Sequence, residues 1–219
     1  MIQPASLTGP ERPPLRGGAA RHLVVLLHGL GADGNDLIGL ADAWAGLVPD
    51  AAFLAPDAPE PCDLAPMGRQ WFSLQSRTPV TLLAGARRAA PVLEAYLERQ
   101  CARFGVAARR LALVGFSQGT MMALHVALRR AQPVACVLGY SGALVGAESL
   151  PGEVRSRPPV LLVHGDADQV VPIGALHGAL DALTRAEVAA EWHICRGTGH
   201  GIDPQGLALG GRFLAERLA

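Results

Sequence analysis

The segment that most constrains the fold of this 219-residue chain lies in its middle, at residues 111–125. Four apolar residues at 111–114 have the length and composition of a buried β-strand. The pentapeptide Gly-Phe-Ser-Gln-Gly follows at 115–119, and apolar residues at helical spacing continue over 121–128. A strand, a sharp turn with Ser117 at its tip and a helix together predict a nucleophile elbow. The two glycines lack the Cβ atoms that would clash in such a turn.

Apolar segments of strand length alternate with helical patterns along the rest of the chain. Further strands are predicted near residues 23–27, 51–55, 134–138, 160–163 and 189–195, and helices near 36–47, 80–104, 173–186 and 204–218. Because the strands are apolar on both faces, they predict an α/β fold with a mostly parallel central sheet and helices on both of its faces.

Three features complete the predicted organisation of the chain. Residues 1–20 are rich in Pro and Gly and predict an extended arm with little regular structure, followed by a single domain at 21–219. Asp36 is a good N-cap for the helix predicted at 36–47. Residues 56–79 predict a long irregular loop, which in a compact domain is usually functional.

Composition argues against several classes of protein. Half of the residues are hydrophobic and 17% are charged, which is typical of a globular chain rather than a disordered one. The 19 basic residues are all Arg, are balanced by 19 acidic residues and form no run longer than two, which argues against a nucleic-acid-binding surface. The four Cys include no C-x-x-C pair, so neither a disulfide framework nor a cysteine metal site is predicted.

We also find no segment with the pattern of a signal peptide and none apolar enough, over sufficient length, to cross a membrane. The sequence therefore predicts a cytoplasmic protein without stable membrane insertion.

A serine hydroxyl becomes an effective nucleophile when a base, normally His, takes its proton and a carboxylate orients that base. In elbow-type folds these residues follow in the order Ser, acid, His. Of the seven His, only His200 lies in a glycine-flanked loop after the last predicted strand. The others come too early or lie within predicted helices or strands: His22, His28, His125, His164, His177 and His193. We therefore predict His200 as the base, with a capping or surface histidine as the competing interpretation.

Two carboxylates, Asp166 and Asp168, follow a predicted strand end and compete for the role of the acid. Asp166 is next to Gly165 and is placed to bind loop amides, as Asx turns do. Asp168 lies farther out, where its side chain can reach the histidine loop, and it is the preferred candidate. Asp203 is only three residues from His200 and is better explained as the N-cap of the last helix.

An oxyanion hole requires backbone N–H donors aimed at the developing negative charge. One donor is expected from Gln118, the residue after the nucleophile, and the other from the glycine-rich loop after the 23–27 strand. In that loop we predict Leu30, which lies between two glycines.

The same glycine-rich loop also matches a dinucleotide-binding pattern. Residues 29–34 read G-x-G-x-x-G, and Asp57 lies where a ribose-binding acid would be expected. Against this interpretation, Asp33 and Asp36 would place negative charge where the pyrophosphate should bind. The predicted helix also begins only after the third glycine.

Substrate contacts are harder to assign. Met67, Trp71 and Phe72 are candidates to line an acyl or alcohol pocket, and a loop held to the core by its aromatic residues is the alternative. Ser141 also follows a strand, but its surroundings lack the elbow pattern, and we interpret it as structural.

Four motifs in this order resemble the phospholipase/carboxylesterase family of α/β hydrolases, which includes acyl-protein thioesterases. They are the glycine-rich loop at 28–36, the elbow at 115–119, His-Gly-Asp-Ala-Asp at 164–168 followed by Val-Pro at 171–172, and Gly-His-Gly-Ile at 199–202. The resemblance covers about residues 20–218 and implies an α/β-hydrolase fold with a minimal lid. It also implies the triad Ser117, Asp168 and His200, oxyanion donors at Leu30 and Gln118, no metal or cofactor, and an enzyme that is often dimeric.

The chain departs from the family pattern at two points. Thr120 stands where many members carry a third glycine after Ser-Gln-Gly. The segment Met-Gly-Arg-Gln-Trp-Phe at 67–72 resembles the bacterial branch more than the eukaryotic thioesterases. Both departures concern acyl-chain preference rather than the triad.

The hypothesis from sequence is a serine carboxylesterase that hydrolyses short- to medium-chain carboxylic esters through an acyl-enzyme intermediate. A thioesterase or lysophospholipase with the same triad is the nearest alternative. A non-catalytic or dinucleotide-binding α/β protein is more distant. The expected partner is a small-molecule ester, not nucleic acid, and the hypothesis allows a homodimer.

Overall fold

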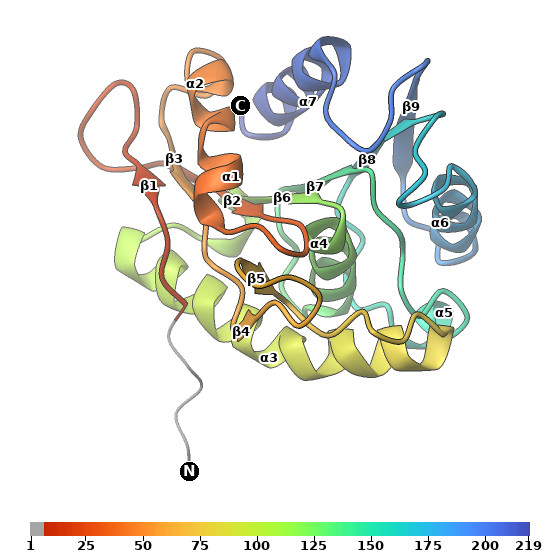
Figure 1. Ribbon diagram of the computed structural model, residues 1–219. Coiled ribbons are helices and arrows are strands. Elements are labelled where there is room, and N and C mark those ends of the chain that lie inside the picture. The colour runs from red at the N-terminus through yellow and green to blue at the C-terminus, as the bar shows by residue number, and fades with distance from the viewer. Residues whose placement is uncertain (1–6) are drawn as a thin grey trace.

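The fold is built on a seven-stranded sheet, shown in Figure 1 for a computed structural model that describes residues 7–219. The strand order is β1-β3-β2-β6-β7-β8-β9, and all neighbours are parallel except β1, which pairs antiparallel with β3. The strands of this sheet are β1 (Glu11–Arg12), β2 (His22–Leu27), β3 (Ala51–Leu54), β6 (Leu111–Phe116), β7 (Cys136–Tyr140), β8 (Val160–Gly165) and β9 (Ala190–Cys195). The mostly parallel sheet expected from the apolar strands is confirmed.

Helices cover both faces of the sheet, as predicted. The helices are α1 (Gly34–Ile38), α2 (Leu40–Trp44), α3 (Pro79–Phe104), α4 (Gln118–Arg129), α5 (Leu150–Glu153), α6 (Gly174–Arg185) and α7 (Pro204–Arg217), with a 3-10 turn at Ala108–Arg110. In Figure 1, α1, α2 and α7 lie on one face, while α3, α4 and α5 lie on the other.

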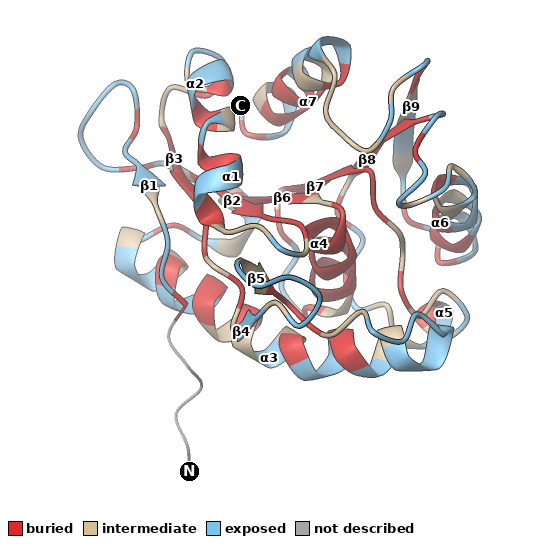
Figure 2. Cartoon of the chain, viewed as in Figure 1, coloured by how far each residue is buried: buried red, intermediate tan, exposed pale blue. Residues whose placement is uncertain are grey.

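The core consists of two apolar clusters, one on each face of the sheet. Strand β6 shows why: Leu111 and Leu113 belong to one cluster, while Ala112 and Val114 belong to the other. This alternation follows from the two-residue period of a strand. Helix α4 packs between the sheet and α3 and is buried along almost its whole length (Figure 2). The helix that carries the elbow is therefore held rigidly by the core.

Two expectations about local structure were wrong. The helix predicted at 36–47 is divided into α1 and α2, and its N-cap is Asp33, whose side chain accepts a 2.8 Å hydrogen bond from the Asn35 amide. Asp36 instead lies in the first turn, because α1 begins at Gly34.

The arm predicted at 1–20 has more regular structure than expected. It contributes β1 to the sheet and the buried side chain of Leu7, whereas residues 1–6 lie outside the described part of the chain. The 56–79 loop likewise contains a small antiparallel pair, β4 (Glu60–Pro61) with β5 (Arg69–Gln70). By contrast, Asp203 caps α7 as predicted, accepting a hydrogen bond from the Gly206 amide.

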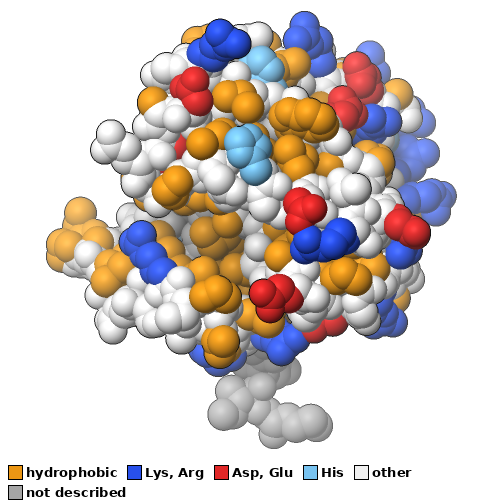
Figure 3. Space-filling view, turned by 90° about the vertical axis from the view of Figure 1, so that its right-hand side faces the viewer, with side chains coloured by type: hydrophobic (Ala, Val, Ile, Leu, Met, Phe, Trp, Pro, Cys, Tyr) orange, Lys and Arg blue, Asp and Glu red, His pale blue; other side chains and the backbone are white. Residues whose placement is uncertain are grey.

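On the face drawn in Figure 3, charged side chains of both signs lie mostly toward the top and the right-hand side, whereas hydrophobic ones gather toward the centre and left. Across residues 7–219, no helix combines the length and the apolar character needed to span a bilayer.

The turn between β6 and α4 has the close packing expected of an elbow. A Cβ atom at Gly119 would lie 1.8 Å from the Leu27 carbonyl oxygen, and one at Gly115 would lie 2.4 Å from the Thr120 nitrogen. These contacts are with backbone, which cannot move aside without displacing β2 or α4. The two glycines therefore allow the helix to begin directly against the neighbouring strand.

We predict that Gly119→Ala lowers the free energy of unfolding by at least about 2 kcal/mol, because the added methyl group collides with backbone. Gly178→Ala is the matched control, since Gly178 is exposed on α6 and a methyl group there would meet no heavy atom within 4 Å. It should stabilise the protein by about 0.5–1 kcal/mol through helix propensity. Chemical denaturation of both variants checks the pair, and equal effects would contradict the steric account.

Candidate active site

The loops that carry the predicted site residues all follow the carboxyl ends of parallel strands in one sheet. Ser117 follows β6, Asp168 lies three residues beyond β8, and His200 follows β9. Because the strands are parallel, these ends meet at one edge of the sheet. Ser117 and His200 line one cavity of about 320 Å³, which we call the active-site cavity.

Ser117 adopts a backbone conformation that non-glycine residues rarely occupy. Its φ is 54° and its ψ is −115°, and it directly precedes the first residue of α4. Its amide donates a 2.9 Å hydrogen bond to the Tyr140 carbonyl, and its own carbonyl accepts from Thr120. Such strain persists only where the surrounding structure imposes it, and here it presents the side chain to the cavity.

Thr120, the first departure from the family pattern, supports this turn. Its hydroxyl donates a 2.8 Å hydrogen bond to the Tyr140 carbonyl, which also accepts from Ser117. The Thr120 side chain occupies space that Cβ atoms at Gly139 and Gly142 would otherwise enter. The threonine is therefore accommodated by two small neighbours without disturbing the elbow.

Asp168 and His200 form a direct contact. His200 Nδ1 lies 2.7 Å from Asp168 Oδ2, and the Asp168 side chain is fully buried. The other carboxylate oxygen accepts 2.9 Å hydrogen bonds from the amides of Val170 and Val171. Burial by itself raises the pKa of Asp168, but the hydrogen bonds from His200, Val171 and Val170 outweigh it, and the pKa is lowered. Asp168 is thus an ionised, fixed acceptor for the His200 ring.

Ser117 and His200 share a cavity without being joined by a polar contact in the described chain. Within residues 7–219, no hydrogen bond joins the serine hydroxyl to the imidazole, although both side chains face the active-site cavity. The Phe116 ring lies against His200, with ring centroids 4.9 Å apart, and so limits the positions of the imidazole. In unliganded enzymes such a hydrogen bond is often long and forms fully only with substrate.

The other two candidate carboxylates, Asp166 and Asp203, bind structural partners. Asp166 accepts a 2.6 Å hydrogen bond from the Gly197 amide and so joins the β8 and β9 loops. Asp203 caps α7 and also accepts from the Cys195 thiol at 3.0 Å. Of the three candidates for the acid, Asp168 is the one whose carboxylate contacts the His200 ring.

The loop predicted to carry an oxyanion donor also reaches the cavity. Leu30 lines it together with Ser117, and Gln118 begins α4 directly after Ser117. In the described chain, neither the Leu30 nor the Gln118 amide donates to another protein group. Both amides are therefore available to a ligand at Ser117.

The dinucleotide interpretation of the same loop does not fit the structure. The Gly34 amide, at the start of α1, donates a 2.8 Å hydrogen bond to Asp57 Oδ1. Asp57, the candidate ribose-binding acid, is thus engaged by the loop, and the amide that would bind a pyrophosphate is occupied. Helix α1 is also only five residues long.

The three candidate substrate contacts lie outside the active-site cavity. Trp71 and Phe72 are each only 1% exposed, and Met67 is 80% exposed on the surface. The Trp71 indole donates to the His28 carbonyl at 3.0 Å, and the Gln118 side chain bonds the main chain of both Trp71 and Phe72. The aromatic pair therefore supports the loops beneath the site, because its rings are more stable in the core than in an open cleft.

Sequence reasoning missed the residues that do form the apolar walls. These come from the end of the 56–79 loop, the start of α3, α4 and the loop after Asp168: Leu74, Leu82, Met121, Val170, Val171 and Pro172. Arg77 and Asp36 also line the cavity. The length of the 56–79 loop and the Val-Pro motif at 171–172 pointed to this region in advance.

Ser141, interpreted as structural, has a φ of 46°, and its hydroxyl donates to the Gly201 carbonyl at 3.3 Å. It therefore links the β7 loop to the histidine loop.

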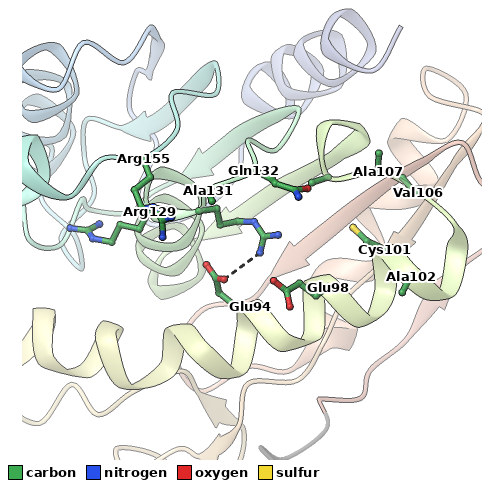
Figure 4. Close-up of a pocket in the computed structure, with 12 residues that line it drawn as sticks. Glu94, Glu98, Cys101, Ala102, Val106, Ala107, Arg129, Ala131, Gln132 and Arg155 are labelled. Atoms are coloured by element: carbon green, nitrogen blue, oxygen red, sulfur yellow. Dashed lines mark ion pairs between the residues drawn. The ribbon is translucent and has the colours of Figure 1, made fainter.

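A larger cavity lies elsewhere, between α3 and the end of α4. It measures about 660 Å³, and Figure 4 shows Glu94 and Glu98 pointing into it from α3. Arg130 and Glu94 form an ion pair across it at 3.7 Å. Its lining residues include neither Ser nor His, so it offers no serine–histidine pair, and burial raises the pKa of its one thiol, Cys101.

Comparison with known proteins agrees with the α/β fold. Residues 16–217 match the family model described as Phospholipase/Carboxylesterase. Esterase YpfH of Escherichia coli K12 is 30% identical over 184 residues, which cover 84% of this chain and 78% of that esterase. The crystal structure of esterase PE8 superposes with a TM-score of 0.93 at 44% identity, covering 98% of this chain and 100% of PE8. Arabidopsis thaliana SOBER1, at 24% identity and a TM-score of 0.78 over 91% of this chain and 100% of its own, shares the fold.

His125, excluded above as a base, is buried on α4, away from the active-site cavity. Burial, assisted by the neighbouring Arg129 and Arg87, lowers its pKa to about 4 against an opposing effect of Glu153. The unfolded chain therefore binds this proton at a higher pH than the folded chain does. Stability contributed by neutral His125 is present above pH ~6.5 and declines as the pH falls toward 4.

Between about pH 6.5 and 4 the wild-type protein loses free energy of unfolding as His125 becomes protonated in the unfolded chain. We predict that His125→Leu makes this loss smaller by on the order of 2 kcal/mol. Urea unfolding at a series of pH values measures this change. His177→Leu, the same exchange at an exposed position of α6, serves as the matched control. A His125→Leu curve parallel to the wild-type curve would disprove the assignment.

Proposed function

The chain belongs to the phospholipase/carboxylesterase family of α/β hydrolases, and on this basis we propose that it is a serine carboxylesterase acting through an acyl-enzyme. The observation that carries the proposal is the 2.7 Å contact between His200 and the buried Asp168, next to a cavity that also contains Ser117. The homology to esterase YpfH and esterase PE8 supports the same reaction class.

In this proposal, Ser117 Oγ attacks the ester carbonyl while His200 Nε2 takes its proton. Asp168 holds His200 through Nδ1 and stabilises the imidazolium. The amides of Leu30 and Gln118 bind the oxyanion, and the positive end of α4 adds to this stabilisation. His200 then protonates the leaving alcohol, and water repeats the sequence on the acyl-enzyme. The scheme uses no metal or cofactor.

We propose short- to medium-chain esters as the substrates. The active-site cavity is small, about 320 Å³, and its walls are mainly aliphatic, which favours an apolar acyl group of limited length. The triad chemistry applies equally to thioesters and lysophospholipids. A panel of short esters, long-chain acyl thioesters and lysolipids distinguishes them, and the proposal expects the highest kcat/KM for the short esters.

Residues 21–219 are proposed to act as one domain, in the cytoplasm. Cys62 and Cys101 are free and partly exposed thiols, as is usual in a reducing compartment.

The family resemblance makes a homodimer the assembly to test, by sedimentation of the purified protein.

We predict that Ser117→Ala lowers kcat for p-nitrophenyl butyrate by at least about 10⁴-fold, because the acyl-enzyme no longer forms. Initial rates with the purified variant measure the effect. The melting temperature should change little, since the exchange leaves the backbone of the turn and the packing of the core as they are. Full activity in Ser117→Ala would refute the proposed function and restore the alternative of a non-catalytic binding protein.

The roles of the two loop aspartates are separable by a matched pair of variants. Asp168→Asn should lower kcat by about 10³–10⁴-fold, because an amide no longer stabilises the imidazolium or selects its tautomer. Asp166→Asn should keep kcat within about threefold, since Asp166 bonds only a loop amide. The same ester assay measures kcat for both variants. A larger loss of kcat in Asp166→Asn than in Asp168→Asn would assign the catalytic role to Asp166.

A further inference from the structure

The segment at 67–72 lies directly against the loop that carries Leu30. The Arg69 amide donates to the Ala32 carbonyl at 2.8 Å, and the Arg69 carbonyl accepts from the Gly31 amide at 2.9 Å. The main chain of one residue therefore holds both residues that follow Leu30. The expectation from the sequence is that this segment contacts substrate, and no link to the oxyanion hole is predicted.

Gly68 shows how close the two segments are. Its φ is +85°, and a Cβ atom there would lie 2.0 Å from the Gly31 carbonyl oxygen. Only glycine fits this conformation and this spacing. A displacement of 67–72 is consequently transmitted to the Leu30 loop.

The Arg69 side chain fixes the position of its own segment. Its Nε donates to the Ala58 carbonyl at 2.8 Å, and its Nη2 donates to the Pro59 carbonyl at 2.7 Å. Over residues 7–219, no carboxylate forms a salt bridge with this guanidinium. Its fork of donors is used instead to hold two consecutive carbonyls, with short charge-assisted hydrogen bonds.

His28 closes the arrangement on the other side of Leu30. The Ala58 amide donates to His28 Nε2 at 2.9 Å, so Nε2 is the acceptor and the ring proton resides on Nδ1. Nδ1–H in turn donates to the Gly29 carbonyl at 2.7 Å. Burial lowers the pKa of His28, which favours the neutral ring.

The geometry of one peptide group links these contacts to the reaction. The Gly29 carbonyl and the Leu30 N–H belong to the same planar trans peptide and point in opposite directions. A hydrogen bond that fixes the carbonyl on one side therefore fixes the direction of the N–H on the other. Together, His28 and Arg69 hold the loop before and after Leu30.

We propose that Arg69 is a positioning residue for ester hydrolysis, which acts with His28 to aim the Leu30 N–H at the oxyanion. This inference rests on the proposed function and adds to it a residue that does not touch the substrate. An oxyanion donor acts mainly in the transition state, so its misalignment lowers kcat while KM changes little.

The test compares Arg69→Gln and Arg69→Lys with Arg157→Gln. Arg157 is a matched control, because its guanidinium also donates to a main-chain carbonyl, that of Ala186 at 2.9 Å, far along the chain from the Leu30 loop. For each variant, kcat and KM are measured with p-nitrophenyl butyrate. Inhibition by butaneboronic acid, which forms a tetrahedral adduct, is compared with inhibition by the product butyrate.

Arg69→Gln should lower kcat by about 10- to 100-fold, leave KM within about threefold and weaken boronic acid inhibition by a similar factor as kcat. Butyrate inhibition and the Arg157→Gln kinetics should stay close to wild type. If Arg69→Gln does not fold, Arg69→Lys decides, with an expected loss in kcat of roughly 3- to 10-fold, since lysine cannot bridge both carbonyls.

Wild-type kcat in Arg69→Lys and Arg69→Gln would overturn the inference. So would a loss carried by KM, or equal weakening of boronic acid and butyrate binding. These results would leave the proposed function intact as long as Ser117→Ala is inactive. Activity in Ser117→Ala would instead refute the proposed function itself.

Discussion

The site depends on a steric constraint at the start of α4, where a serine with positive φ must follow β6 while the helix begins against the end of β2. Gly119 allows this because no side chain separates it from the Leu27 carbonyl. The same packing brings the loop after β2, with Leu30, beside Ser117. Ser117 is thus positioned by core packing, whereas hydrogen bonds of the His28 and Arg69 side chains hold the segments around Leu30.

Around this turn, each loop is held by a small number of polar contacts. The buried Asp168 carboxylate is held by two amides and in turn orients His200, while the Gln118 side chain fastens the 71–72 backbone to the elbow. Such buried hydrogen bonds are costly to break, because an unpaired buried polar group loses its solvation without compensation. The arrangement is therefore preorganised before any substrate arrives.

Much of the fold and of the candidate site could be predicted from the sequence, because the decisive signals are local. The apolar runs indicated the parallel sheet, and four motifs in order indicated the family, which the comparisons confirm. Contacts between distant segments could not be read in this way. The burial of Trp71 and the contact of Arg69 with the Leu30 loop each depend on how segments meet in three dimensions. No periodicity or spacing in the chain encodes them.

The central claim is that Ser117 is the residue that becomes acylated, and covalent labelling tests it most directly. The folded wild-type protein would be treated with a fluorophosphonate, its esterase activity followed, and the modified peptide identified by mass spectrometry. The account predicts one label per chain, located on Ser117, that appears in step with the loss of activity. Complete loss of activity with the label on another residue, or full activity with Ser117 labelled, would contradict it.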